Sequence, residues 1–195
     1  MSPFPKEPKK IAERIRRYEN ALRKEIQMHG TIDDGAGKRY LLGVLYLLKG
    51  DPSGALKSYA WREAALPNDG GEPLDYLCWT LALYRSGDID AAAKKLRQTM
   101  LQNLYLVPAL IGEEQVRLDI WVGANWGEND YLQDAPAEYF ALWDEDALGW
   151  ARQTYQSPGM REARDRQIAI LKQLKTEPVG PKRAKLVEEL YQLRR

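Results

Sequence analysis

The feature that most restricts the fold of this sequence is an internal repeat whose two copies are offset by 37 residues, from Gly50 to Gly87. KGDPSGALKSY from Lys49 aligns without gaps with SGDIDAAAKKL from Ser86. The copies share a Gly-Asp pair, an Ala five residues after that Gly, and a later Lys. Self-similarity at this period is typical of stacked supersecondary units. Each copy is therefore expected to be one such unit.

An apolar helix is predicted before each Gly-Asp pair. YLLGVLYLL precedes the first pair and YLCWTLALY precedes the second. A second helix is predicted to begin near Ser53 in the first copy and near Asp90 in the second. Residues 36 to 104 should thus form two antiparallel helical hairpins.

The first copy resembles the tetratricopeptide repeat family. The pattern of that family is Trp, two residues, Leu-Gly, two residues, Tyr, then Ala, three residues, an aromatic, and later Pro. Arg39 stands in the Trp slot, and the other six slots are filled as the pattern asks, by Leu42, Gly43, Tyr46, Ala55, Tyr59 and Pro67. The resemblance implies an all-α fold of helical hairpins stacked into a superhelix.

The second copy keeps only Ala92 as an identity with that pattern. Its other slots are held by Tyr76, Trp79, Thr80, Leu83, Leu96 and Leu104. This copy is identified mainly by its relation to the first. Two repeats are fewer than a stable solenoid generally needs, so the terminal helices are expected to act as caps at both ends.

The repeat positions also have a physical role of their own. Gly43 and Thr80 are small where the two helices of a hairpin must approach closely. Gly50 and Gly87 can end the first helix of each hairpin in the left-handed conformation, which strains other residues. Larger side chains such as Tyr59 and Trp79 are expected to fill the space between hairpins.

Helices are also predicted outside the repeats. Apolar residues recur every three or four positions from Pro8 to His29, with Gly30 as the stop. Asp33 or Asp34 is expected to accept hydrogen bonds from the start of the next helix. Residues 117 to 136 have no helical period and predict an ordered loop whose Trp121, Trp126 and Tyr131 pack onto the hairpins. Helices return over 137–195, with Asp144 as an N-cap and breaks at 157–159 and 178–181.

Composition limits the domain count and the class of partner. The chain has 195 residues, 44% hydrophobic and 29% charged, which predicts a single all-helical domain over 1–195. The 29 Lys and Arg nearly balance the 28 Asp and Glu, so no nucleic-acid or anionic-lipid partner is expected. The longest apolar runs are about half the ~20 residues that span a bilayer, so no membrane partner is expected either. A single cysteine, Cys78, excludes an internal disulfide and favours the cytoplasm.

Few residues offer catalytic or metal chemistry, and we predict no catalytic residue, no metal site and no cofactor. Cys78 lies within an apolar helix, which indicates core packing. His29, the one histidine, sits at a helix end near Asp33 and Asp34, where a cap or charge interaction is favoured over a metal site. The alternative is a small hydrolase-like enzyme using carboxylates within 119–150, such as Asp119, Asp130 and Asp144.

The resemblance implies a non-catalytic scaffold that binds a partner protein or peptide in a groove lined by the first helix of each hairpin. The groove-facing candidates are mainly apolar, namely Tyr40, Val44, Leu47 and Leu48 in the first copy and Leu77, Leu81, Tyr84 and Arg85 in the second. Only Arg85 could hold a peptide carboxylate. Such a groove either accepts an apolar partner segment or is covered by the helix from Pro8 to His29. If it is covered, binding would use Trp121 and Trp126 or the convex face, and a homodimer or a homo-oligomeric structural subunit is also possible.

Overall fold

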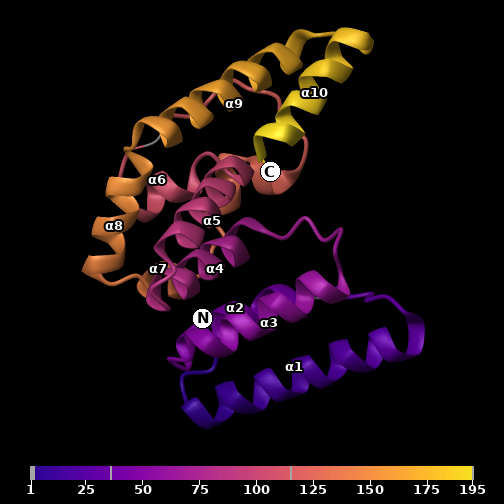
Figure 1. The fold of residues 1–195 in the computed structure, drawn as a ribbon, viewed down its shortest axis with the longest axis vertical. Coiled ribbons are helices and arrows are strands. Elements are labelled where there is room, and N and C mark those ends of the chain that lie inside the picture. Colours follow the sequence, from indigo (N-terminus) through magenta and orange to yellow (C-terminus); the bar gives the residue numbers. More distant parts are fainter. Residues whose placement is uncertain (1–2, 36, 115, 195) are drawn as a thin grey trace. The chain divides into compact units, whose positions relative to one another are not determined.

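The structure is a computed structural model that describes residues 3–35, 37–114 and 116–194. Ten α-helices and two short 3-10 helices make up this part of the chain, and it contains no strand (Figure 1). The prediction of an all-α protein is confirmed. Ala36, the first residue of the predicted repeat region, lies outside the described residues.

The chain divides into two compact units, where the sequence predicted one domain. Unit 1 comprises Met1–Ala92 and Pro136–Trp143, and unit 2 comprises Ala93–Ala135 and Asp144–Arg195. The division falls inside helix α5 (Ile89–Gln102), so the second predicted hairpin is shared between the units.

Unit 1 contains α1 (Pro8–His29), α2 (Lys38–Leu48), α3 (Pro52–Ala65), α4 (Pro73–Arg85) and the short α7 (Ala137–Ala141). Helix α1 packs on α2, α2 packs on both α3 and α4, α3 packs on α4, and α7 contacts α4 (Figure 1). The two predicted first helices, α2 and α4, are therefore neighbours in space.

Helix α1 has the bounds that its apolar spacing predicts. Ile11, Ile15 and Leu22 are buried on one face. Gly30 ends the helix with φ 68°, and its N–H donates to the Ile26 carbonyl. A charged outer surface and a narrow apolar stripe are typical of a helix that covers one side of a core.

The turn inside each repeat is built in the same way in both copies. Gly50 has φ 77° and Gly87 has φ 81°, as predicted. The carboxylate of Asp51 accepts from the Gly54 N–H at 2.8 Å. The carboxylate of Asp88 accepts from the Ala91 N–H at 3.1 Å, so each Asp caps the helix that follows it. The repeated Gly-Asp pair thus ends one helix and begins the next in both copies.

The close approach predicted at Gly43 is also observed. A Cβ atom added to Gly43 would lie 1.8 Å from the hydroxyl oxygen of Tyr59. Ala55, on the same helix as Tyr59, is fully buried. Glycine is required at position 43 because the Tyr59 side chain of α3 lies directly on the backbone of α2.

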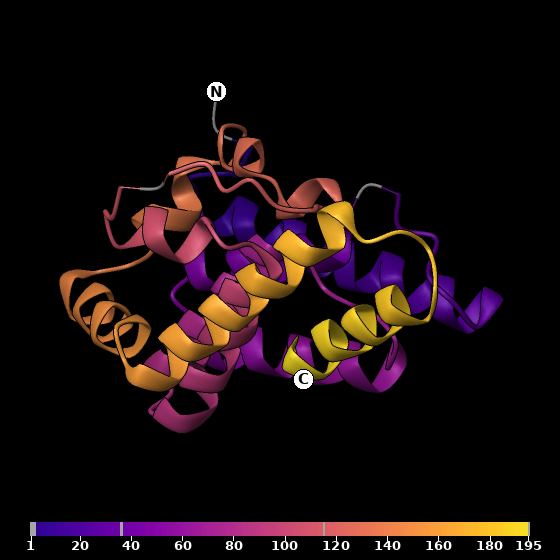
Figure 2. The ribbon, with the colours of Figure 1, turned by 90° about the horizontal axis from the view of Figure 1, so that it is seen from above.

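Unit 2 contains the rest of α5, α6 (Leu106–Leu110), η1 (Asn125–Gly127), η2 (Asn129–Leu132), α8 (Glu145–Tyr155), α9 (Pro158–Thr176) and α10 (Pro181–Arg194). Helices α9 and α10, orange and yellow in Figure 2, pack on each other. Their buried side chains and Leu104 form an aliphatic cluster, comprising Leu104, Ile170, Leu171, Leu174, Leu186 and Leu190. Asp144 caps α8 as predicted, accepting from the Ala147 N–H at 3.0 Å.

The segment 117–136 differs in part from the predicted loop. It includes η1 and η2, and the Asn103 side-chain amide holds it by donating to the carbonyls of Trp126 at 2.6 Å and Glu128 at 3.1 Å. Trp121 packs against the aliphatic cluster of α9 and α10, whereas 47% of Trp126 is exposed. Trp126 is therefore more exposed than predicted, and its backbone carbonyl takes part in the bonds that hold the segment.

None of the helices in the described part of the chain combines the length and the apolar character that crossing a bilayer requires.

Candidate functional site

Unit 1 holds a partly buried ionic cluster, which we name the Arg62 cluster and define as Arg39, Tyr40, Arg62, Asp69 and Asp75. The Arg62 guanidinium is 2.6 Å from a carboxylate oxygen of Asp75 and 3.9 Å from one of Asp69. The Arg62 side chain is 6% exposed and that of Asp75 is fully buried. Three rings face the guanidinium at 5.2 to 5.7 Å, those of Tyr59, Tyr40 and Trp79.

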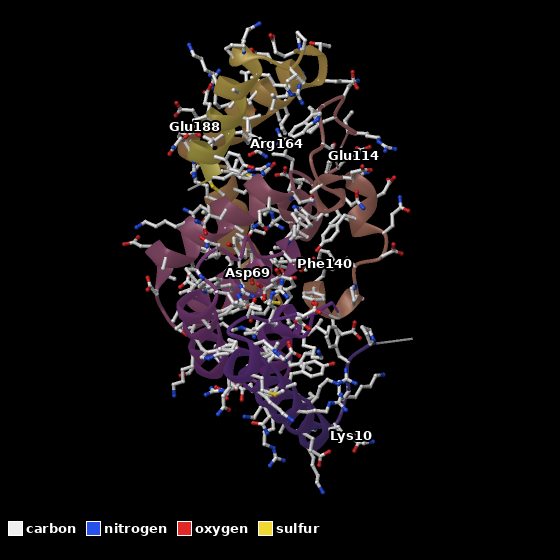
Figure 3. All side chains as sticks on the ribbon, turned by 90° about the vertical axis from the view of Figure 1, so that its right-hand side faces the viewer. Lys10, Asp69, Glu114, Phe140, Arg164 and Glu188 are labelled. Carbon is white, nitrogen blue, oxygen red and sulfur yellow. The ribbon has the colours of Figure 1, made fainter. Side chains whose placement is uncertain are left out.

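Asp69, labelled in Figure 3, joins α2 to this cluster. Its carboxylate accepts from the Tyr40 hydroxyl at 2.6 Å and from Arg39 Nε at 3.0 Å. Burial by itself would raise the pKa of Asp69, but the hydrogen bonds from Tyr40 and the Gly71 N–H and the charges of Arg39 and Arg62 lower it below its usual value. Burial, with the adjacent Asp69 carboxylate, raises the pKa of Tyr40 to about 12. Asp69 is therefore ionised and Tyr40 is protonated at neutral pH.

Two carboxyl groups at the start of α4 have pKa values close to neutral. Burial raises the pKa of Asp75 to about 6, although the Arg62 charge acts in the opposite direction. Burial, then the negative charge of Asp75, raises the pKa of Glu72 to about 7. Glu72 also caps α4 by accepting from the Asp75 N–H at 3.2 Å. Glu72 can therefore gain or lose a proton near physiological pH.

A cavity of about 490 Å³ lies beside this cluster, within unit 1. Its walls come from the chain's first residues, α1, α2, the start of α4 and α7, and are formed by Pro3, Phe4, Arg14, Tyr18, Gly37, Tyr40, Leu41, Leu45, Glu72, Leu74, Pro136 and Tyr139. Most of these side chains are apolar or aromatic. Arg14 and Glu72 supply one group of each charge. Such a cavity suits an apolar or aromatic group that carries a polar end.

The predicted groove residues are divided between this cavity and the core. Tyr40 lines the cavity. Val44, Leu47, Leu77 and Leu81 are at most 2% exposed, so in this structure they are core residues of α2 and α4. Partner contact through these four would need helices to separate. Helix α1 packs on α2, the first of the two predicted first helices.

The remaining predicted residues lie elsewhere. Leu48 and Tyr84 are half-buried. Arg85 is exposed and donates to the Leu142 carbonyl at 2.6 Å, so its guanidinium is already used within unit 1. Trp121 lies in unit 2. Its backbone N–H donates to the Leu171 carbonyl at 3.1 Å, and the Arg183 guanidinium lies 5.4 Å from its ring.

Sequence patterns point only weakly to the cavity residues outside α2. Phe4 and Tyr139 meet only through the tertiary structure, because they lie at distant positions in the chain. Tyr18 belongs to the apolar stripe of α1, which indicates packing rather than a site. Glu72 had one local signal, since an acidic residue directly before Pro73 is a typical helix start.

The candidate catalytic residues are placed in ordinary structural roles. Cys78 is 2% exposed, and burial raises the pKa of its thiol well above the usual value. His29 is exposed at the end of α1, and the described residues contain no group of three or more His, Cys, Asp or Glu that could hold a metal. Asp119 is paired with Lys175 at the surface of unit 2, and Asp130 with Arg117 at 3.6 Å.

Comparison of the chain with known proteins identifies no family to which it belongs. Searches with protein-family models, curated proteins and solved structures gave no match in any of the three.

Proposed function

We propose that this protein is a non-catalytic binding module of tetratricopeptide type, whose cavity in unit 1 takes a segment of a partner protein. The observation that carries the proposal is the position of the cavity. It is lined by Tyr40, Leu41 and Leu45 of α2 and by Leu74 of α4, which are the first helices of the two predicted repeats. First helices are also the elements that line the groove in the family that the sequence resembles.

The local structure of the repeats supports this assignment. The Gly-Asp turns of the two copies have the same backbone conformation and the same capping bond. Gly43 of α2 lies directly against Tyr59 of α3, which is the close approach of two helices predicted for that glycine. Helices α2, α3 and α4 pack consecutively. A location in the cytoplasm and the absence of nucleic-acid and membrane partners stay predictions.

An enzyme is the second candidate, and one observation favours it. Glu72 lines the cavity with a pKa of about 7, which is suitable for a general acid or base. We favour binding because Glu72 already caps α4 and the charged groups around it are paired with one another. Replacing Glu72 by Gln separates the two functions, since it would abolish acid–base chemistry and leave most of the apolar wall intact.

Site-specific photo-crosslinking in the native host cell tests the proposal. A benzophenone amino acid at position 18 places the reactive group at the cavity, whereas the same residue at position 16 lies on the exposed side of α1. We expect a defined protein adduct from position 18 and none from position 16.

Two leucines of α2 provide a matched pair of variants. Leu41 and Leu48 are both half-buried, but only Leu41 lines the cavity. Leu41→Arg should remove the adduct from position 18, and Leu48→Arg should preserve it. An adduct that survives Leu41→Arg, or the lack of any adduct from position 18, would count against partner binding at the cavity.

A further inference from the structure

A proline-flanked aromatic residue from the start of the chain is buried in unit 1. Phe4 is 7% exposed, although it lies outside every helix. Its ring packs edge-on against the Tyr139 ring, with the centroids 5.7 Å apart and an interplanar angle of 72°. This geometry is favourable for aromatic pairs. The Phe4 side chain therefore lies in a position that an aromatic ring fills favourably.

The backbone beside Phe4 is held as well. Arg14 of α1 donates from Nη1 to the Pro3 carbonyl at 2.7 Å. Pro3 and Phe4 both form part of the cavity wall, together with Tyr139 of α7. A basic side chain that binds a backbone carbonyl next to a buried ring is a way of recognising a peptide, and it does not depend on helical structure in the segment.

The two prolines lower the cost of this binding. Proline fixes φ, and the residue before a proline is biased towards extended conformations, so Pro3-Phe4-Pro5 loses little freedom when it binds. Proline-flanked segments are recognised by aromatic-lined grooves for the same reason. The cavity of about 490 Å³ that remains beside Phe4 leaves room for more of a ligand than this segment supplies.

We propose that the cavity of unit 1 recognises a non-helical segment in which an aromatic residue is flanked by prolines, and that Pro3-Phe4-Pro5 is the segment of this chain that already binds at its wall. The inference rests on the proposed function, because it names the chemistry of the partner segment. A partner would present the same kind of segment and would displace Phe4 from Tyr139. The short connection to α1 holds Phe4 at an effective concentration of roughly millimolar, so a partner with a larger contact area can compete.

The test is a direct peptide-binding measurement with the full chain. The probe is a peptide of residues 1–8, MSPFPKEP, with a fluorophore at its C-terminal end. In the Phe4→Ala protein the aromatic position is empty. Fluorescence anisotropy should show this variant binding the peptide at least about tenfold more tightly than the wild type, in which the tethered segment competes. The same peptide with Ala in place of Phe should bind neither protein.

A pair of arginines on α1 gives the matched control. Phe4→Ala/Arg14→Ala lacks the donor to the Pro3 carbonyl and should bind the peptide several-fold more weakly than Phe4→Ala. Phe4→Ala/Arg16→Ala changes an arginine that does not line the cavity and should bind as Phe4→Ala does. Equal helical circular dichroism of all variants would show that they are folded.

Three results would overturn the inference: no peptide binding by Phe4→Ala, equal binding by the Ala peptide, or equal binding by the wild type. A fourth contradicting result would come from light scattering. If the wild type is a dimer and Phe4→Ala is a monomer, the segment binds a second copy of the chain and not the cavity of its own chain. If the peptide fails while position 18 still forms its photo-adduct, the inference is wrong and partner binding stands. If the peptide binds but position 18 forms no adduct, the cavity recognises the proline-flanked segment of this chain, and the proposed binding of a partner protein is contradicted.

Discussion

The two units differ in the polar side chains that they bury: charged groups in unit 1 and neutral groups in unit 2. The buried polar side chains of unit 1 include the charged Asp34, Arg62 and Asp75, whereas those of unit 2, among the described residues, are the neutral Thr99, Asn103 and Gln167. Gln167 donates to the Leu101 carbonyl at 2.7 Å, and Thr99 donates to the Lys95 carbonyl at 2.8 Å. Neutral groups need only a hydrogen-bond partner, but buried charges need a compensating charge as well.

The stability of unit 1 should therefore depend on pH, and that of unit 2 should depend on the volume of its buried side chains. A buried ion pair contributes little net stability, yet losing one partner leaves the other charge in a medium that cannot solvate it. An aliphatic cluster responds instead to the volume that is removed. Two substitutions in each unit therefore test whether buried charge and buried volume affect stability differently.

The largest effect is expected for Asp75→Ala in unit 1. It leaves the Arg62 guanidinium buried without the carboxylate 2.6 Å away, and should lower the free energy of unfolding by about 3–5 kcal/mol. Urea denaturation gives the loss, and hydrogen exchange should locate it in α2, α3 and α4. The double variant Arg62→Met/Asp75→Leu should recover most of the stability. A double variant as unstable as Asp75→Ala would mean that the pair itself supplies the stability.

Leu174→Ala is the counterpart in unit 2. Leu174 is fully buried in the aliphatic cluster, and its truncation should cost about 3 kcal/mol through lost burial and the cavity left behind. The loss should be the same at pH 5 and pH 8, as measured by urea denaturation at both. Leu193→Ala, at the edge of the same cluster, should cost clearly less. A pH-dependent loss at position 174 would contradict the contrast between the units.

Glu72→Gln tests the pH dependence of unit 1. The pKa of Glu72 is raised above its usual value, so folding favours the protonated form; the associated stability is present below about pH 4.5 and is lost as the pH rises through about 7. Between pH 5 and pH 8 the wild type should lose about 2 kcal/mol more than Glu72→Gln, since each pKa unit is worth about 1.4 kcal/mol and solvent screening reduces the total. Glu72→Gln should retain part of the pH dependence of stability, because the pKa of Asp75 is raised to about 6 and Asp75 titrates in the same range. The exposed Glu63→Gln on α3 should behave as the wild type, and an unchanged slope in Glu72→Gln would show that Glu72 does not titrate near neutral pH.

The smallest effect is expected for Glu189→Gln in unit 2. Glu189 of α10 pairs with Arg166 of α9, and their side chains are 40% and 49% exposed. Exposed pairs contribute little, so the loss should stay below about 0.5 kcal/mol and shrink with added salt. Thermal denaturation at low and high ionic strength measures it. A loss comparable to that of Asp75→Ala would remove the distinction between buried and exposed pairs.

The sequence predicted the helices well because their limits depend on neighbouring residues. The apolar spacing of α1 and the stop at Gly30 placed both of its ends, and the Gly-Asp pairs placed the turns of both repeats. Asp144 caps α8 as predicted, whereas Pro158 and Pro181, which were predicted to lie in breaks between helices, are the first residues of α9 and α10. Capping bonds and glycine conformations span only a few residues, so the chain carries them wherever it folds.

The candidate site was far less predictable. Of the groove residues expected in the two first helices, Tyr40 lines the cavity, while Val44 and Leu81 are buried between helices. Apolar spacing identifies the faces of a helix that avoid water, but it does not say which neighbour covers each face. The raised pKa of Glu72 depends on burial and on Asp75, and no sequence pattern reports how deeply a carboxyl group is buried.

The all-α class, the approximate positions of the helices and the two matching turns can be read from the residues alone, because they follow from hydrogen bonds and periodicities within a few residues. The joint burial of Arg62 and Asp75, the contact of Phe4 with Tyr139 and the division of α5 between two units emerge only when the chain is packed. Those outcomes depend on the packing of many side chains at once. Each contact is weak alone, and the arrangement is fixed only by their sum.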